Sequence, residues 1–236
     1  MTHDDAPTAG VAGEAGGLSL AGLPPLSVAI QAGGESRRMG RSKATVPFLG
    51  RPLLERIVTR VAPIAAEIVI TTNEPENLGF LDDHPARGRI RLVRDRYDRR
   101  GSVTGLATAL SAATNDCVAI VACDMVFASP ELFLAEYRAM LADEGVDVVV
   151  PHTQFGYEPF HAVYRRARCL DALVSAIDDG CGSIRQFMET IAVRDFAMEE
   201  VARTVPDGRC FINTNTPDEL AHAEQIVRDL ARSGRG

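Results

Sequence analysis

The stretch Ser27–Lys43 reads SVAIQAGGESRRMGRSK. Its first five residues, Ser27–Gln31, are mostly apolar and predict a short buried strand, whereas the glycines and charged residues that follow predict a loop at the end of that strand. Gly33, Gly34 and Gly40 carry no side chain, so their backbone N–H groups can approach a phosphate closely. The stretch therefore predicts an anion-binding loop after the first strand of an α/β protein.

The same loop is rich in cations. Arg37, Arg38, Arg41 and Lys43 place four positive charges within seven residues of a chain whose formal charge is −7. Such a concentration suits a small polyanion, whereas the overall acidity argues against a broad nucleic-acid surface. A solvated basic loop is the alternative interpretation. Arg38 and Lys43 can add side-chain charge to the anion-binding backbone of the loop.

Two common phosphate loops do not fit this spacing. A dinucleotide-binding turn needs G-x-G-x-x-G, and a P-loop needs four residues between its glycines followed by Lys-Ser/Thr. Here five residues separate Gly34 from Gly40, and Lys43 follows three residues later. The spacing therefore disfavours both a Rossmann oxidoreductase and a P-loop NTPase.

Downstream of the loop, short apolar runs alternate with segments of helical periodicity, which is the pattern of successive βαβ units. We expect one α/β domain over residues 26–236, with a Rossmann-like, mainly parallel sheet flanked by helices, after a disordered leader at residues 1–25. Strands are predicted at residues 27–31, 67–71, 90–93, 117–122, 147–150, 160–164 and 210–212. Helices are predicted at residues 52–61, 104–113, 130–141, 169–177, 183–190 and 217–231.

Asp124 comes directly after the apolar run Cys117–Ala122 and Cys123. Parallel sheets bind ligands at the carboxyl ends of their strands, and Mg²⁺ prefers oxygen ligands. An Asp at this point also fits a turn or a cap. Asp124 at this strand end can therefore coordinate Mg²⁺ that bridges a triphosphate.

Further polar residues follow other predicted strands. Asn73 and Asp95 come after the second and third strands, where each, taken alone, also fits a turn. Asn213 and Asn215 are two apart on an extended piece, so their amides point the same way and suit a metal or an acceptor phosphate. His161 is expected to be a core or edge histidine rather than a catalyst.

The composition indicates where the protein works. Five cysteines are present, an odd number without C-x-x-C or zinc-site spacing, so reduced thiols are expected. The sequence contains neither a secretory leader nor the run of about eighteen apolar residues that a membrane span needs. We expect a cytoplasmic protein that binds neither membranes nor nucleic acids.

The loop resembles the signature of the molybdenum cofactor guanylyltransferases, a family of nucleotidyltransferases whose pattern is similar to L-A-G-G-x-S-x-R-M-G-x-x-K. This sequence departs from the family at Gln31, where the family usually has Leu, and after Asp124, where the family's Pro is absent. Weaker resemblances cover Cys123-Asp124 (the family's C-D-x-P), Gly101–Leu106 (G-P-L-A-G-L) and Phe211–Pro217 (F-x-N-I-N-T-P). The loop matches the family at Ala32, Gly33, Gly34, Ser36, Arg38, Met39, Gly40 and Lys43.

The resemblance implies a fold of the nucleotide-diphospho-sugar transferase type and a nucleotide site that uses Mg²⁺. The residues it implies for nucleotide or acceptor contacts are Gln31, Ala32, Gly33, Gly34, Ser36, Lys43, Asn73, Asp95, Gly101, Gly105, Asp124, Asn213 and Asn215. The metal ligand among them is Asp124, and the catalytic residues that the resemblance implies are Lys43, Arg38 and Asp124, which hold the triphosphate and its metal.

The function that the resemblance implies is transfer of GMP from GTP to molybdenum-bearing molybdopterin, with release of pyrophosphate. It also implies transient contact with cofactor-delivery proteins or molybdoenzymes. Gly33-Gly34 favours guanine, because related cytidylyltransferases tend to have Ala-Gly there. The alternatives are a cytidylyltransferase, a sugar-phosphate nucleotidyltransferase, or a nucleotide-binding relative without catalysis.

Overall fold

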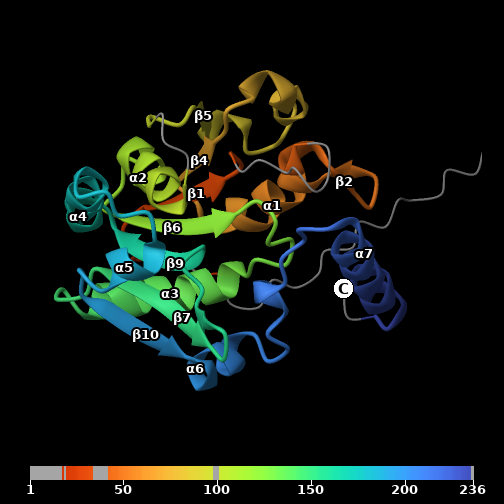
Figure 1. Ribbon diagram of the computed structural model, residues 1–236. Helices are drawn as coiled ribbons and strands as arrows, with labels where there is room; N and C mark the ends of the chain where they lie inside the picture. The colour runs from red at the N-terminus through yellow and green to blue at the C-terminus, as the bar shows by residue number, and fades with distance from the viewer. Residues whose placement is uncertain (1–17, 19, 34–41, 98–100, 235–236) are drawn as a thin grey trace, which may run out of the picture.

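A mainly parallel β-sheet lies at the centre of the molecule (Figure 1), and the computed structural model describes residues 18, 20–33, 42–97 and 101–234. The strands are β1 (Leu26–Gln31), β2 (Pro47–Phe48), β3 (Arg51–Pro52), β4 (Glu67–Thr71), β5 (Ile90–Val93), β6 (Cys117–Ala122), β7 (Val148–Thr153), β8 (Gly156–Tyr157), β9 (His161–Arg165) and β10 (Val193–Ala197).

The main sheet has the strand order β10-β7-β9-β6-β1-β4-β5, with β8 paired to β7 and a separate β2–β3 hairpin. β1 is central: Ala29 pairs in parallel with Val69 on β4 and with Ile120 on β6. Only β9 reverses direction along this order, since it is antiparallel to both β6 and β7. The carboxyl ends of β6, β1, β4 and β5 therefore lie side by side along one edge.

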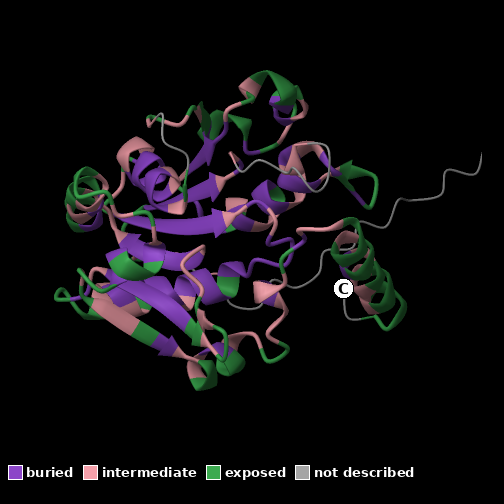
Figure 2. Cartoon of the chain, viewed as in Figure 1, coloured by how far each residue is buried: buried purple, intermediate pink, exposed green. Residues whose placement is uncertain are grey.

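Helices cover both faces of the sheet and bury it (Figure 2). Along β1, Val28 and Ile30 face one core cluster with residues of α1 and α3, whereas Ala29 faces a second cluster with residues of α2 and α4. This alternation is why a strand buried on both faces is apolar throughout. The helices are α1 (Leu53–Val61), α2 (Ser102–Ala112), α3 (Pro130–Ala142), α4 (Arg166–Asp178), α5 (Ile184–Met188), α6 (Met198–Thr204) and α7 (Pro217–Arg232).

The α/β class and the mainly parallel sheet are as predicted, and two helix starts have the predicted chemistry. The Ser129 side chain accepts from the Leu132 N–H at the start of α3, and Thr216 forms a capping box with Glu219 at the start of α7. The strand predicted at 210–212 was wrong, because these residues belong mostly to a 3₁₀ turn, η5 (Arg209–Phe211), that follows a left-handed Gly208. The β2–β3 hairpin, β8, β10 and α6 were not predicted.

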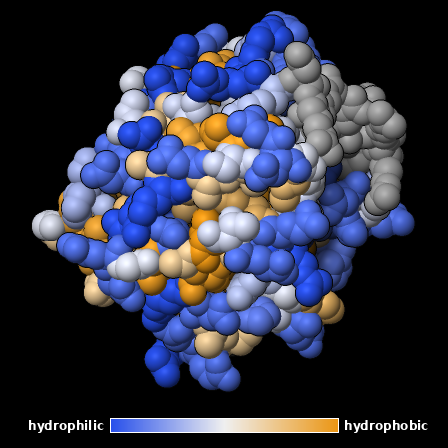
Figure 3. Space-filling view, turned by 60° about the vertical axis from the view of Figure 1, so that its left-hand side comes forward, coloured by the Kyte–Doolittle hydropathy of each residue, from blue (hydrophilic) through white to orange (hydrophobic). Residues whose placement is uncertain are grey.

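Residues 1–17 and 19 of the expected leader lie outside the described residues. In its last part, Leu20 and Leu23 pack against the first core cluster, and the Tyr137 hydroxyl donates to the Pro24 carbonyl at 3.1 Å. Contacts with the core thus begin before β1. The face seen in Figure 3 is largely hydrophilic, with apolar side chains gathered across its middle. Within the described part of the chain, no helix is long and apolar enough to cross a membrane.

Candidate active site

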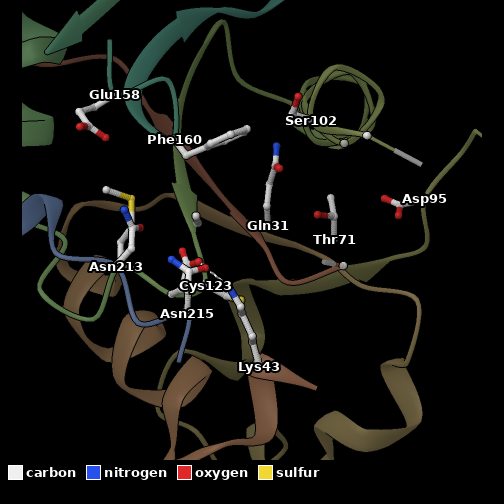
Figure 4. A pocket seen from close by; sticks show the side chains of 16 residues that line it. Gln31, Lys43, Thr71, Asp95, Ser102, Cys123, Glu158, Phe160, Asn213 and Asn215 are labelled. Atoms are coloured by element: carbon white, nitrogen blue, oxygen red, sulfur yellow. Dashed lines mark hydrogen bonds and ion pairs between the residues drawn. The ribbon is translucent and has the colours of Figure 1, made fainter. Parts of the chain in front are cut away.

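A cavity of about 580 Å³ opens at the carboxyl ends of β1, β4, β5 and β6 (Figure 4). This is the edge at which parallel sheets bind ligands, because the loops that leave the strands surround it. The cavity is lined by Gln31, Gly33, Lys43, Thr71, Asp95, Gly101, Ser102, Gly105, Ala122, Cys123, Asp124, Met125, Glu158, Phe160, Asn213 and Asn215. We call it the nucleotide pocket, after the ligand that the sequence resemblance implies.

A three-residue contact marks one end of this pocket. Lys43 Nζ lies 2.7 Å from Asp124 Oδ2 and 2.5 Å from Asn215 Oδ1. The three residues come from the start of η1 (Lys43–Thr45), the turn after β6 and the segment before α7. Lys43 is the only lysine in the chain. The fold thus brings together two oxygen ligands and one ammonium from distant parts of the sequence.

The backbone of Asp124 is held from the C-terminal segment. Both the N–H and the hydroxyl of buried Thr214 donate to the Asp124 carbonyl at 3.0 Å. Next along the chain, the Asn215 N–H donates to Glu219 Oε2 at 2.6 Å, so the capping box of α7 also fixes Asn215. These bonds preorganise the carboxylate and the amide before any ligand binds.

The opposite end of the pocket has a different chemistry. Asn73 Nδ2 donates to Asp95 Oδ2 at 2.9 Å, so the two residues that follow β4 and β5 form a pair. A Cβ added to Gly33 would lie 3.2 Å from Asp95 Oδ2 and 3.6 Å from Asn73 Nδ2. Gly33 therefore leaves open the space in front of a carboxylate that accepts hydrogen bonds.

Gln31 lies between these two ends, at the tip of β1. Its Oε1 is 3.2 Å from the position that a Cβ on Gly105 would take, so this glycine makes room for the amide. Its Nε2 is buried and has no hydrogen-bond partner among the residues that the structure describes. In Figure 4 the Gln31 side chain extends from the sheet between Phe160 and Ser102.

Most of the residues singled out in the sequence line this pocket, with exceptions. Ala32 is buried in the first core cluster, where its N–H donates to the Thr71 carbonyl, and it does not line the pocket. Gly34, Ser36 and Arg38 lie outside the described residues. The other predicted residues lie at the same edge of the sheet. They are Gly33, Lys43, Asn73 and Asp95 at the two ends of the pocket, and Gln31, Gly101, Gly105, Asp124, Asn213 and Asn215.

Several lining residues were missed by sequence reasoning. Thr71, the last residue of β4, had the same strand-end signal as its neighbours. Ser102 begins α2. Glu158 and Phe160 come before β9, and they reach the pocket because β9 runs antiparallel to β6, a direction that no local sequence pattern indicates. Burial raises the pKa of Glu158, and the Thr153 hydroxyl, which donates to its carboxylate, acts in the opposite direction.

Two groups near the pocket are unsuited to covalent or acid–base catalysis. Burial raises the pKa of the Cys123 thiol to about 12, so it stays protonated and is a poor nucleophile. His161 is fully buried, stacks on Phe133 with ring centroids 3.9 Å apart, and accepts from the Ser129 N–H. Burial lowers the pKa of His161 to about 3. The prediction that His161 is a core histidine is confirmed.

The oxygen atoms around Lys43 fit a hard cation. The positively charged Lys43 ammonium contacts both Asp124 Oδ2 and Asn215 Oδ1, so this position favours a cation. Among the residues that the structure describes, no group of three or more His, Cys, Asp or Glu side chains forms a complete metal cage. Mg²⁺ commonly takes one or two protein carboxylates and completes its shell with water and substrate phosphates. The donor set therefore suits magnesium that arrives with a triphosphate.

A strand-end carboxylate, an ammonium beside it and a second carboxylate at the other end of one pocket are groups that suit a nucleotidyltransferase. The comparisons agree. The family model described as MobA-like NTP transferase domain matches residues 28–196. The chain therefore belongs to the MobA-like NTP transferase family.

Individual relatives cover most of the chain. The molybdenum cofactor guanylyltransferase of Desulfosudis oleivorans is 32% identical over 202 residues, which are 84% of this chain and 94% of that protein. The crystal structure of molybdopterin-guanine dinucleotide biosynthesis protein A from Archaeoglobus fulgidus matches with a TM-score of 0.73 and 27% identity, over 86% of this chain and 99% of that one. The 4-diphosphocytidyl-2C-methyl-D-erythritol synthase of Anaerococcus prevotii shares the fold, with a TM-score of 0.65, 16% identity and coverage of 86% and 98%.

Proposed function

We propose that the protein transfers GMP from GTP to molybdenum-bearing molybdopterin and releases pyrophosphate. The observation that carries the proposal is the pocket itself, which has a cation and oxygen ligands at one end and a paired carboxylate at the other. The relatives named as guanylyltransferases support the same acceptor and donor.

The base end supports guanine. The Asp95 carboxylate offers acceptors, and the Asn73 amide that donates to it holds it in place. Guanine presents two adjacent donors, its N1–H and its 2-amino group, which suit a carboxylate. Cytosine presents one amino donor beside ring and carbonyl acceptors, so the same carboxylate would face a lone pair. Gly33 leaves the space that the base needs.

The phosphate end supports in-line transfer. An oxygen of the acceptor phosphate attacks the α-phosphorus of GTP, a new P–O bond forms, and the bond to the β-phosphate breaks so that pyrophosphate leaves. Lys43, which is 18% exposed, is placed to neutralise charge on the phosphates, and Asn215 and Asn213 line the side where the acceptor phosphate enters. Asp124, with Asn215, would hold Mg²⁺, which would shield the phosphate charges when bound.

A labelling experiment tests the proposal. The protein is incubated with molybdopterin, Mg²⁺ and GTP labelled at the α-phosphate, and the label is followed into a product whose mass is that of the guanine dinucleotide. We expect transfer by the wild type and loss of transfer in Asp124→Asn, which keeps the size of the side chain. Binding of GTP without transfer would contradict the proposal and favour a nucleotide-binding relative without catalysis.

A further inference from the structure

A second cavity, of about 410 Å³, adjoins the nucleotide pocket. Its walls are mainly apolar and include Phe155 from the turn between β7 and β8, Met198 at the start of α6, and Phe211 and Ile212 from η5 and the residue after it. We call this cavity the apolar groove. Phe155 is 89% exposed and Met198 is 37% exposed, so large apolar side chains stand open to solvent at its rim. Such an exposed apolar rim is typical of a binding surface.

Glu158 joins the two cavities, because it lines both the nucleotide pocket and the apolar groove. Its backbone N–H donates to the Pro151 carbonyl at 3.0 Å, and the Thr153 hydroxyl donates to its Oε1 at 3.3 Å. The carboxyl is thus held at the seam by the end of β7. A carboxyl group among apolar walls requires a partner with hydrogen-bond donors.

The apolar groove adjoins the Glu158 side of the pocket, and Asp95 does not line it. Asp95 and Thr71 lie on one side of the pocket and Glu158 and Asn213 on the other, whereas Lys43 lies at the bottom of the view (Figure 4). Asn213 directly follows the groove residues Phe211 and Ile212 in the chain. A molecule whose phosphate lies at the asparagines would extend its remaining part toward Glu158 and the groove.

We propose that the apolar groove binds the pterin ring of the acceptor, with the Glu158 carboxylate accepting from the ring N–H and the 2-amino group. This proposal rests on the function proposed above. The pyrimidinone edge of a pterin carries two adjacent donors, as guanine does, and a carboxylate matches both at once. The apolar side chains of Phe155, Phe211 and Ile212 cover the faces of a flat heterocycle. The site therefore has two carboxylates for two similar edges, Asp95 for the donor base and Glu158 for the acceptor ring.

The first test is kinetic and uses the full-length protein with GTP and molybdopterin. Glu158→Gln keeps one acceptor but places an amide N–H against a ring donor, so the KM for molybdopterin should rise by about tenfold or more while the KM for GTP changes less than about twofold. Phe155→Ser should raise the same KM by removing an apolar wall. Glu199→Gln, an exposed carboxyl on α6 outside the groove, is the matched control and should change neither constant. An unchanged KM for molybdopterin in Glu158→Gln, or a rise confined to GTP, overturns the proposal.

The second test needs no catalysis and so separates this proposal from the proposed function. Binding of 6-hydroxymethylpterin phosphate is followed by its fluorescence and compared with the corresponding lumazine phosphate, which has an oxygen in place of the 2-amino group. The wild type should bind the pterin about tenfold more tightly, and Glu158→Gln should lose most of this preference, because the preference arises from the carboxylate. No binding of the pterin, or an equal preference in both proteins, overturns the inference. Failure of guanylyl transfer with the pterin preference intact would instead contradict the proposed function alone.

Discussion

Replacement of Lys43 by methionine removes the ammonium but keeps an unbranched side chain of similar length. In the free protein Lys43 Nζ contacts Asp124 and Asn215 at 2.7 and 2.5 Å, and phosphate oxygens that enter the same space would meet it at similar range. Two unit charges about 4 Å apart near a protein surface interact by about 4 kcal/mol. Loss of one preorganised donor to a transition state costs about 2.7–4 kcal/mol in characterised enzymes. We therefore expect kcat to fall by about 10²- to 10³-fold.

The assay is pyrophosphate release at saturating GTP and molybdopterin, and the fall should lie mainly in kcat because the charge to be neutralised develops during transfer. Arg185→Met, at an exposed side chain on α5, loses the same charge outside the site and is the control. Because Lys43 is the only lysine, an amine-selective reagent followed by mass spectrometry reports it directly, and GTP with Mg²⁺ should protect it. Unimpaired turnover in Lys43→Met would refute the role of this residue in the mechanism.

Three further predictions concern the elements around the site. Gly33→Ala places a Cβ 3.2 Å from Asp95 Oδ2, so the KM for GTP should rise by about tenfold or more with little change in melting temperature; a normal KM would remove Gly33 from the base site. Thr214→Val deletes one of two hydrogen bonds to the Asp124 carbonyl. The free energy of unfolding in urea should fall by about 1 kcal/mol and kcat by about tenfold. A loss of stability with a normal kcat would show that Asp124 needs no such support. Burial raises the pKa of Glu136 and lowers that of its partner His161 to about 3. Above about pH 6.5 histidine is neutral in the unfolded chain as well, so Glu136 alone of this pair binds a proton more readily in the folded state. The free energy of unfolding should therefore fall with rising pH, by up to about 1.4 kcal/mol per unit. Glu136→Gln should abolish that fall in urea denaturation just above about pH 6.5, and identical slopes in the two proteins would contradict the assignment.

Much of the fold follows from local patterns. The central strands β1 and β6 are mostly apolar because they are buried on both faces, and α3 and α7 begin at capping residues. The last third of the chain is different. β9 was predicted as a strand, but its antiparallel pairing with β6 and β7 depends on tertiary packing. Residues 210–212 are apolar like a strand, yet left-handed Gly208 turns the chain and the Ile212 N–H closes a turn on the Arg209 carbonyl.

The candidate site was predictable to the extent that its residues follow strands. Asp124, Asn73 and Asp95 each come just after a parallel strand, and the strand order places them on one edge. The contact of Lys43 with Asn215 joins positions 172 residues apart, and only the fold reveals it. Glu158 had no signal of its own, because the groove that it borders is made by segments from three separate parts of the chain.

The most direct test of the central claim is nucleotide selectivity. Pyrophosphate release is measured with molybdopterin, Mg²⁺ and each of GTP, CTP, ATP and UTP, for the wild type and for Asp95→Asn, in which the second acceptor oxygen of the base end becomes a donor. We expect release with GTP at least about tenfold above the other nucleotides, and a loss of most of that preference in Asp95→Asn. A wild-type preference for CTP would contradict guanylyl transfer and the role given to Asp95, while leaving the fold and the family unchanged.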